Sequence, residues 1–569
     1  MGKIVKLGFD ADSYLESARR KYDDGRLIDA IADYHTVIEY DPENKTAYIE
    51  MAHAYEDIGC DDAAEKTFMK MIGADRKWDE GYIGMMVHCL LNGDDRMAKY
   101  YLDQGKKYGA FDDSDEVDDY TEMVNEAGRI ADEHAYKEGR GGFSLVKDGT
   151  DETLFLAQAL LFGGEYDFAQ TVFEGVDKDS KYYDQARMGL VHVLYMQGKY
   201  DECIARCDDL LKKNPESMPL LIEKMLACYD SGRFDEAYEV GDRLDALDLK
   251  SKRDVQALAV AFMQAQDDDY AAKYHEKMLE FLPYDRDSLL VIAQAEYNLG
   301  MRAEAREDAM VLRKLYPEDP AAAFYARHIV LGDVKEFTLS YDIPEEELEK
   351  REKRVSAKIR RLGTIDAVEK ELDNDATFLE EVKCLLLEKH NPVGTEVAKF
   401  LCRSGKWRPY IRSLLLDTSI SVGTKCSMIE AYLNYSDDKS YEVGTGNAVL
   451  FFDPVVPAPV GTKEEEAIYW YVVANLTFRA RDFSGPIAKS YEKLISAMHE
   501  KNVPKFSKQV IAGVMLYEAG LEQFPTVDRC LDVFNTSPGR MRSLIRKAGL
   551  SDDDRTKREK EQTPAKKGE

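Results

Sequence analysis

Small and hydrophobic residues recur along the first half of the chain with a period of 34 residues. Glycine marks the period in seven of eight slots: Gly25, Gly59, Gly93, Gly164, Gly198, Gly232 and Gly300. The remaining slot holds Gln266. Alanine stands five positions after the glycine slot in seven units, and Cys203 takes its place in the other. A period of this length predicts a stack of two-helix units.

Each unit is predicted to contain a helix, a turn at the glycine slot, a second helix and a break. Glycine can adopt the left-handed conformation that ends the first helix. The alanine lets the two helices cross closely. Several units end in a proline, which cannot continue a helix but starts the next one well: Pro42, Pro215, Pro283 and Pro317. Because one hairpin cannot bury its apolar face alone, the stack is the fold.

The repeat resembles the tetratricopeptide repeat (TPR) family. The resemblance rests on segments such as Asp24-Gly25-Arg26-Leu27-Ile28-Asp29-Ala30-Ile31, Gly198-Lys199-Tyr200-Asp201-Glu202 and Gly232-Arg233-Phe234-Asp235-Glu236-Ala237. It covers roughly residues 11–110 and 150–320, and it implies an all-α, right-handed superhelix. The aromatic residue expected in the second helix is present as Tyr34, Phe68 and Phe173, but is replaced at Cys207, Gly241 and His275. These later units are expected to pack less regularly.

The pattern predicts five segments. They are N-terminal repeats (1–110), a degenerate repeat with an acidic and Gly-rich insertion (111–149), a second array (150–320), a helical C-terminal region (321–550) and a disordered charged tail (551–569). Within the C-terminal region, the apolar run Val449-Leu450-Phe451-Phe452-Asp453-Pro454-Val455-Val456-Pro457 follows Gly444 and Gly446. It predicts a short strand pair or a buried extended element at about residues 441–460.

Charge and composition narrow the classes of partner. The 569-residue chain has a formal net charge of −31, so nucleic acid and anionic membrane surfaces are unfavourable partners. No segment approaches about 18 uninterrupted apolar residues, and the N-terminus does not read as a secretory signal. Nine scattered cysteines without a CxxC pair indicate reduced thiols. A cytoplasmic protein is therefore expected.

No motif points to a catalytic or cofactor site. The glycines at 139–142 and 444–446 do not form a full GxGxxG, and no GxxxxGK[ST], HExxH or GxSxG is present. Cys203 and Cys207 are explained by core packing, and Cys384, His390, Cys402 and Cys426 are too loosely spaced for a zinc site. We therefore expect no enzyme activity, cofactor or metal.

In the TPR family the concave face is lined by the first helix of each unit. The resemblance therefore implies a partner-binding surface made of Met188, His192, Tyr195, Ile222, Leu226, Tyr229, Met263, Gln294, Tyr297 and Asn298. The Lys/Asn/Arg cluster with which family members grip a C-terminal carboxylate is absent. Apolar, aromatic and methionine side chains make adaptable contacts, so an apolar peptide or a helix of another protein is the expected partner.

One alternative stays open at this point. The chain could be an enzyme or regulator whose active or DNA-contacting part lies in residues 321–550, with the repeats as its sensor or adaptor. Two features support it: the irregular segment at 441–460, and a helix pair at about 526–548 whose second helix is basic. A deep cavity with converging polar groups near 441–460 would favour this alternative.

Overall fold

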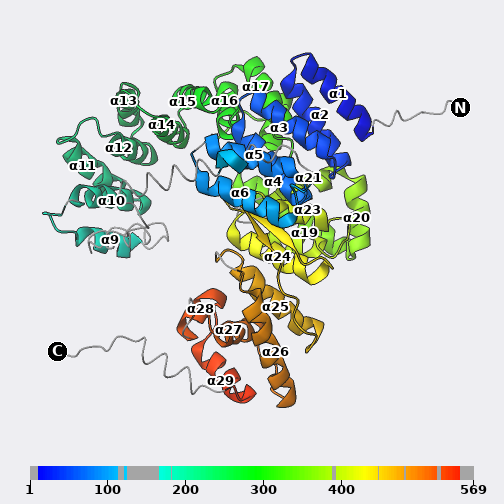
Figure 1. Ribbon diagram of the computed structural model, residues 1–569. Helices are drawn as coiled ribbons and strands as arrows, with labels where there is room; N and C mark the ends of the chain where they lie inside the picture. The colour runs from blue at the N-terminus through cyan, green and yellow to red at the C-terminus, as the bar shows by residue number, and fades with distance from the viewer. Residues whose placement is uncertain are drawn as a thin grey trace, which may run out of the picture. The chain divides into compact units, whose positions relative to one another are not determined.

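The structure, a computed structural model, describes residues 10–91, 93–112, 121–124, 166–180, 182–387, 392–445, 448–479, 482–521, 524 and 527–550 (Figure 1). It divides into two compact units. Unit 1 comprises residues 1–64, 86–106 and 111–344, and unit 2 comprises residues 65–85, 107–110 and 345–569. The predictions for the acidic insertion and the charged tail fall largely outside the described residues, and the predicted five-segment division stays a prediction.

Unit 1 is built from helix hairpins. Its N-terminal helices are α1 (Ala11–Asp23), α2 (Leu27–Tyr40) and α3 (Lys45–Asp57). Three further helices contribute residues to both units: α4 (Asp61–Ala74), α5 (Asp79–Leu91) and α6 (Asp95–Tyr108).

The second array of unit 1 is a further series of paired helices (Figure 1). These are α9 (Tyr166–Glu174), α10 (Tyr183–Met196), α11 (Tyr200–Leu211), α12 (Met218–Asp230), α13 (Phe234–Asp245), α14 (Lys252–Gln264), α15 (Asp268–Phe281), α16 (Arg286–Asn298), α17 (Arg302–Leu315) and α18 (Pro320–Leu331). The first helices of the hairpins, α10, α12, α14, α16 and α18, form what we call the first-helix face.

The repeat slots have the geometry that the period predicts. Gly198 has φ 70° and Gly300 has φ 85°, so the chain takes the left-handed conformation at these turns. Ala271 and Ala305 are 0% exposed, as close helix crossing requires. The predicted TPR-like helical solenoid is confirmed.

The two ends of the described chain in unit 1 meet. Helix α2 packs on α17, where Lys314 Nζ lies 2.7 Å from Asp29 Oδ1 and the Tyr55 hydroxyl donates to the Leu315 carbonyl at 2.8 Å. The hydrogen bond from Lys314 holds the pKa of Asp29 below its usual value. Residues that are hundreds of positions apart thereby share one core.

Unit 2 is helical and carries one β-hairpin. Its C-terminal elements are α19 (Glu345–Leu362), α20 (Ile365–Asn374), α21 (Ala376–Leu387), α22 (Pro392–Leu401), α23 (Arg408–Leu414), α24 (Val422–Tyr435), β1 (Tyr441–Thr445), β2 (Ala448–Phe452), α25 (Lys463–Leu476), α26 (Ser484–Glu500), α27 (Lys508–Ala519), α28 (Val527–Phe534) and α29 (Pro538–Ala548). Strands β1 and β2 are antiparallel, with Tyr441 opposite Phe452. The predicted small β element at 441–460 is confirmed as this hairpin.

Candidate peptide-binding site

The residues predicted to bind a partner all lie on first helices of unit 1, but their exposure differs along the row. On α10 and α12, Met188, His192, Tyr195, Ile222 and Tyr229 are half-buried, and Leu226 is buried. On α14 and α16, Met263, Gln294 and Tyr297 are buried, and Asn298 is half-buried. A segment of the chain itself covers this second group.

Residues 334–342, which we call the strap, connect α18 to α19 and cross the α14–α18 part of the array without helical or strand structure. Asn298 accepts from the Phe337 N–H at 2.7 Å and donates to the Phe337 carbonyl at 2.8 Å. Gln266 makes the same pair of bonds to Leu339, at 2.7 and 3.0 Å. Gln294 does so with Ser340, at 3.0 and 2.8 Å. Three side-chain amides thus each bind both polar groups of one strap residue.

This arrangement replaces the hydrogen bonds that neighbouring strands would supply. In an extended chain, the N–H and C=O of residues two apart point to the same edge, and those of the next residue point to the other. Asn298 and Gln266 therefore satisfy one edge at Phe337 and Leu339, and Gln294 satisfies the opposite edge at Ser340. Each such bond contributes about 1 kcal/mol net.

Alternate strap side chains are buried. Phe337 and Leu339 are 7% and 3% exposed, whereas Lys335, Glu336 and Thr338 are exposed. The Phe337 ring centroid lies 4.8 Å from that of Tyr297 and 5.3 Å from that of Tyr325. Burying one such ring stabilises the attachment by roughly 1.5–3 kcal/mol. The face thus selects for bulky apolar side chains two residues apart.

A histidine fixes the far end of the strap. His275 Nδ1 lies 2.7 Å from the Ala271 carbonyl, so this nitrogen carries the hydrogen. Its Nε2, 2.9 Å from the Tyr341 hydroxyl, then accepts in the neutral form. Burial lowers the pKa of His275, which favours this neutral tautomer.

The α10–α12 part of the face has different chemistry. His192 Nδ1 lies 2.5 Å from Glu223 Oε1, and this hydrogen bond raises the pKa of His192. The Tyr195 hydroxyl donates to Asp230 at 2.8 Å, and Tyr229 packs edge-on against Phe234 at 5.4 Å between ring centroids. No strap contact is recorded for these residues within the described part of the chain.

Three residues that hold the strap were absent from the sequence-based site: Gln266, His275 and Tyr325. Two of them were visible as exceptions to the repeat, since Gln266 replaces the slot glycine and His275 replaces the second-helix aromatic. Gln266 keeps the left-handed backbone of the slot, with φ 53°. That conformation costs a non-glycine residue about 1–2 kcal/mol. A strained glutamine at a glycine position indicates that its side chain has a function there.

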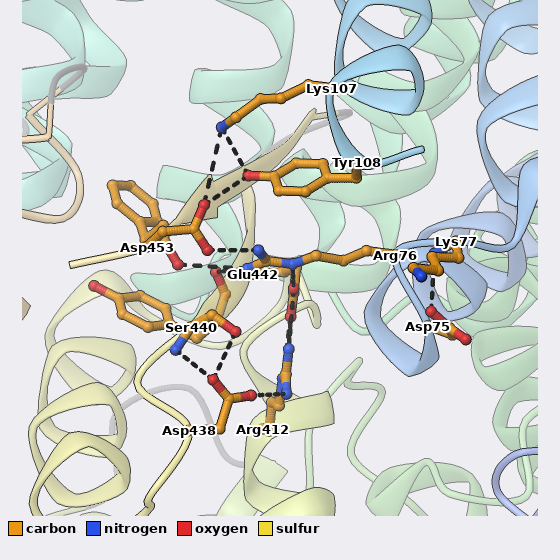
Figure 2. Close-up of polar contacts among 12 residues, drawn as sticks. Asp75, Arg76, Lys77, Lys107, Tyr108, Arg412, Asp438, Ser440, Glu442 and Asp453 are labelled. Atoms are coloured by element: carbon orange, nitrogen blue, oxygen red, sulfur yellow. Dashed lines mark hydrogen bonds and ion pairs between the residues drawn. The ribbon is translucent and has the colours of Figure 1, made fainter. Parts of the chain in front are cut away.

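A second polar cluster lies in unit 2, at the β-hairpin (Figure 2). The Glu442 carboxylate, 1% exposed, is bound by Arg76 and by Arg412, whose Nη2 is 2.8 Å from Oε2. The Asp453 carboxylate accepts hydrogen bonds from Arg76 Nη1 at 2.6 Å and from the Tyr108 hydroxyl at 3.0 Å. Burial alone would raise the pKa of Asp453, but these two donors hold it below its usual value. Both carboxylates are engaged by cations, so the cluster fastens the α4–α5 turn, the end of α6 and α23 to the hairpin within unit 2.

Among the described residues, one small pocket lies beside the hairpin. The pocket described beside it is lined by Tyr441, Phe452, Thr477, Asp482 and neighbouring residues and leaves about 10 Å³ free, room for one water at most. Within it, the hydroxyls of Tyr441 and Thr477 bind each other at 2.8 Å. Among the described residues no group of three or more His, Cys, Asp and Glu is placed to hold a metal. His390 lies outside them.

The basic helices of unit 2 differ in their surroundings. On α19, Arg354 Nε lies 2.6 Å from Glu381, and Lys358 Nζ lies 2.5 Å from Asp375, so this helix is matched by acids of its own unit. On α29 the basic residues Arg540, Arg542, Arg546 and Lys547 are exposed. In the part of the chain that is described, no helix is both long and apolar enough to cross a membrane.

Comparison with known proteins assigns this chain neither a family nor an activity. No family model matches the chain, and no curated protein matches it. Among solved structures, it is similar to the TPR domain of P58(IPK) (TM-score 0.21, 16% identity, covering 56% of this chain and 97% of that one). Yeast Tom70 gives a TM-score of 0.20 at 12% identity, covering 97% of this chain and 99% of Tom70. A chain from Naa15/Naa10 bound to HypK-THB gives 0.18 at 14% identity, covering 95% and 89%. With TM-scores of this size, none of these structures assigns a partner or an activity to this chain.

Proposed function

We propose that this protein is an interaction scaffold whose first-helix face holds an extended segment of another protein, without a chemical step. The observation that supports it most is the strap. An extended segment lies on this face, its backbone bound by three amides and its alternate side chains buried. On the α14–α18 part every residue except proline offers the N–H and C=O that the amides bind, so the selectivity of that part comes from the alternate side chains that it buries.

The strap-free α10–α12 part of the face supplies the partner-binding residues in this proposal. Tyr195 and Tyr229 occupy the same repeat slot as Tyr297, the residue that packs on Phe337. Aromatic residues in such positions carry much of the energy of protein interfaces. A segment lying here would continue the path that the strap takes on α14–α18.

Site-specific photo-cross-linking tests the proposal. A benzoylphenylalanine replaces Tyr229 on α12 in one variant and Tyr238 on α13, which is 57% exposed, in a control. We expect a defined protein adduct from position 229 and none from position 238. Tyr195→Ala/Tyr229→Ala should then weaken the isolated complex by at least about tenfold. Tyr297 is left out of this variant because it is buried beneath the strap. Equal adducts from both positions would contradict the proposal.

A further inference from the structure

The strap is attached to the face in an unusual way. Among the described residues, no backbone–backbone hydrogen bond is recorded for strap positions 334–341. All the recorded hydrogen bonds between strap backbone and array come from side chains: three amides and the hydroxyls of Tyr297 and Tyr325. The strap can therefore leave the face without breaking a helix or a sheet.

The amide set is confined to the place where the strap lies. Gln294 corresponds by the 34-residue period to His192, Leu226 and Val260 in the earlier repeats. Asn298 corresponds to Met196, Asp230 and Gln264. None of these gives the bidentate amide pair, and the strained Gln266 occurs in one slot alone of the eight. The α14–α18 part of the face is thus a built receptor for one extended segment, and not a general property of the repeat.

Each end of the strap also has a residue that separates it from the flanking helices. Gly332 ends α18 with φ 65°, and Pro344 precedes α19. Glycine ends helices in the left-handed conformation, and a proline disfavours the helical conformation of the residue directly before it, here Ile343. The strap is consequently a separate extended segment between two helices.

We propose that the strap is an exchangeable internal ligand of this receptor. Its replacement is an extended segment of a partner protein with bulky apolar side chains two residues apart, in the positions of Phe337 and Leu339. Asn298, Gln266 and Gln294 bind the backbone of the incoming segment as they bind the strap. This inference rests on the proposed scaffold function, and it adds a competitor that a segment binding to the α14–α18 part of the face must displace.

Competition by a tethered segment sets the expected affinities. A ligand on the same chain acts at an effective concentration of about a millimolar. An incoming segment binds only the fraction of molecules whose strap has left, so its apparent Kd is the intrinsic value divided by that fraction. Weakening the strap should therefore tighten binding of a free peptide, which a purely structural segment would not do.

The first experiment uses a fluorescein-labelled peptide of residues 333–344 as the probe. Three full-length proteins are compared: the natural chain, Phe337→Ala/Leu339→Ala, and the latter with Gln294→Leu/Asn298→Ala added. We expect the second protein to bind the probe at least about tenfold more tightly than the first, and the third to lose that gain. A probe with serine in place of Phe337 and Leu339 should not bind. If the second protein keeps its helical content and binds no more tightly than the first, the proposal is wrong.

The second experiment needs no substitution and covers the case in which the double variant does not fold. Hydrogen exchange is followed at the strap amides of Phe337, Leu339 and Ser340 and at Ala295 in α16. An exchangeable strap should open locally, so its amides exchange at least about 100-fold faster, relative to their intrinsic rates, than Ala295. Equal protection would show that the strap opens only with global unfolding, and would overturn the inference. The cross-link at position 229 could still form in that case, so the two proposals fail separately.

Discussion

The two parts of the first-helix face share one 34-residue repeat but differ in chemistry. On α10 and α12 the slot residues are apolar or form pairs among themselves, such as Tyr195 with Asp230. In the α14–α18 part, side chains of the face bind the backbone of the strap. The comparison teaches that the repeat determines which face of the array a side chain lies on. The residues that depart from the repeat determine what that face binds.

The largest expected effect is at the ring that anchors the strap. Phe337→Ala should lower the free energy of unfolding by about 3–5 kcal/mol, since the ring is buried between Tyr297 and Tyr325. Tyr229→Ala, on the strap-free part, should cost less than about 1 kcal/mol because its ring is half exposed. Urea denaturation monitored by circular dichroism measures both. Equal losses would mean that the two parts of the face do not differ in the way described.

The second largest effect is expected at a buried acid, which is present in the strap-bearing part of the array and absent from the earlier repeats. Glu296 on α16 is 9% exposed, and its slot holds Leu194, Cys228 and Phe262 in the earlier repeats. Burial, with the charge of Asp308 beside it, raises the pKa of Glu296 from 4.5 to about 8. The folded state therefore favours the protonated acid, and the stability this gives is present below pH 4.5 and lost as the pH rises toward 8.

Glu296→Gln removes that titration. We expect the variant to be more stable than the natural chain at pH 8.5, by roughly 1–3 kcal/mol, and nearly equal to it near pH 4.5. The measurement is the urea midpoint as a function of pH. A constant difference between the two proteins at all pH values would contradict the raised pKa of Glu296.

Much of the fold could be predicted from the sequence, because the repeat is marked by small residues that its turns and close helix crossings require. Gly300 and Ala305 each have one structural reason for their positions, and the period places them. The apolar run at about 441–460 predicted a short strand pair or a buried extended element, and the strand pair is the form present, at 441–452. What could not be predicted was that residues 334–342 return to the array, since an extended segment bound by side chains has no periodic signal of its own.

The candidate site shows the same limit. The resemblance to the TPR family implied Gln294, Tyr297 and Asn298 on α16, and their role in binding a partner stays a prediction. Tyr325 and the strap were missed because their proximity depends on the path of the chain after α18. Gln266 and His275 carried a usable signal, since both break the pattern in one hairpin. Two departures from the repeat in one hairpin indicate a binding site more strongly than either departure alone.

Gln266 allows a smaller, sharper test of that signal. Gln266→Gly relieves the left-handed strain but removes two hydrogen bonds to Leu339. The two effects, each about 1–2 kcal/mol, should nearly cancel in the free energy of unfolding. Hydrogen exchange at the Leu339 amide should nevertheless become faster, because the lost bonds belong to the strap. Gln266→Asn is the matched control: it tolerates the backbone conformation but is one methylene too short to reach. If the Leu339 amide keeps its protection in both variants, the amide of Gln266 does not hold the strap.

The smallest expected effects come from two histidines, and they have opposite signs. Burial lowers the pKa of His275, so the stability that depends on its neutral form is present above pH 6.5 and lost as the pH falls through the lowered value. The hydrogen bond that His192 donates to Glu223 raises the pKa of His192, so its contribution is present below pH 6.5 and lost as the pH rises through the raised value. An NMR titration of the histidine Cε1–H signals should place the midpoint of His275 below 6.5 and that of His192 above it.

His275→Gln and His192→Gln identify the signals and should change the pH dependence of stability in opposite directions. Because Tyr341 is the strap residue bonded to His275, acidification should loosen the strap while it strengthens the His192–Glu223 pair. Two midpoints on the same side of 6.5 would remove the electrostatic difference between the two parts of the face and leave only the difference in what they bind.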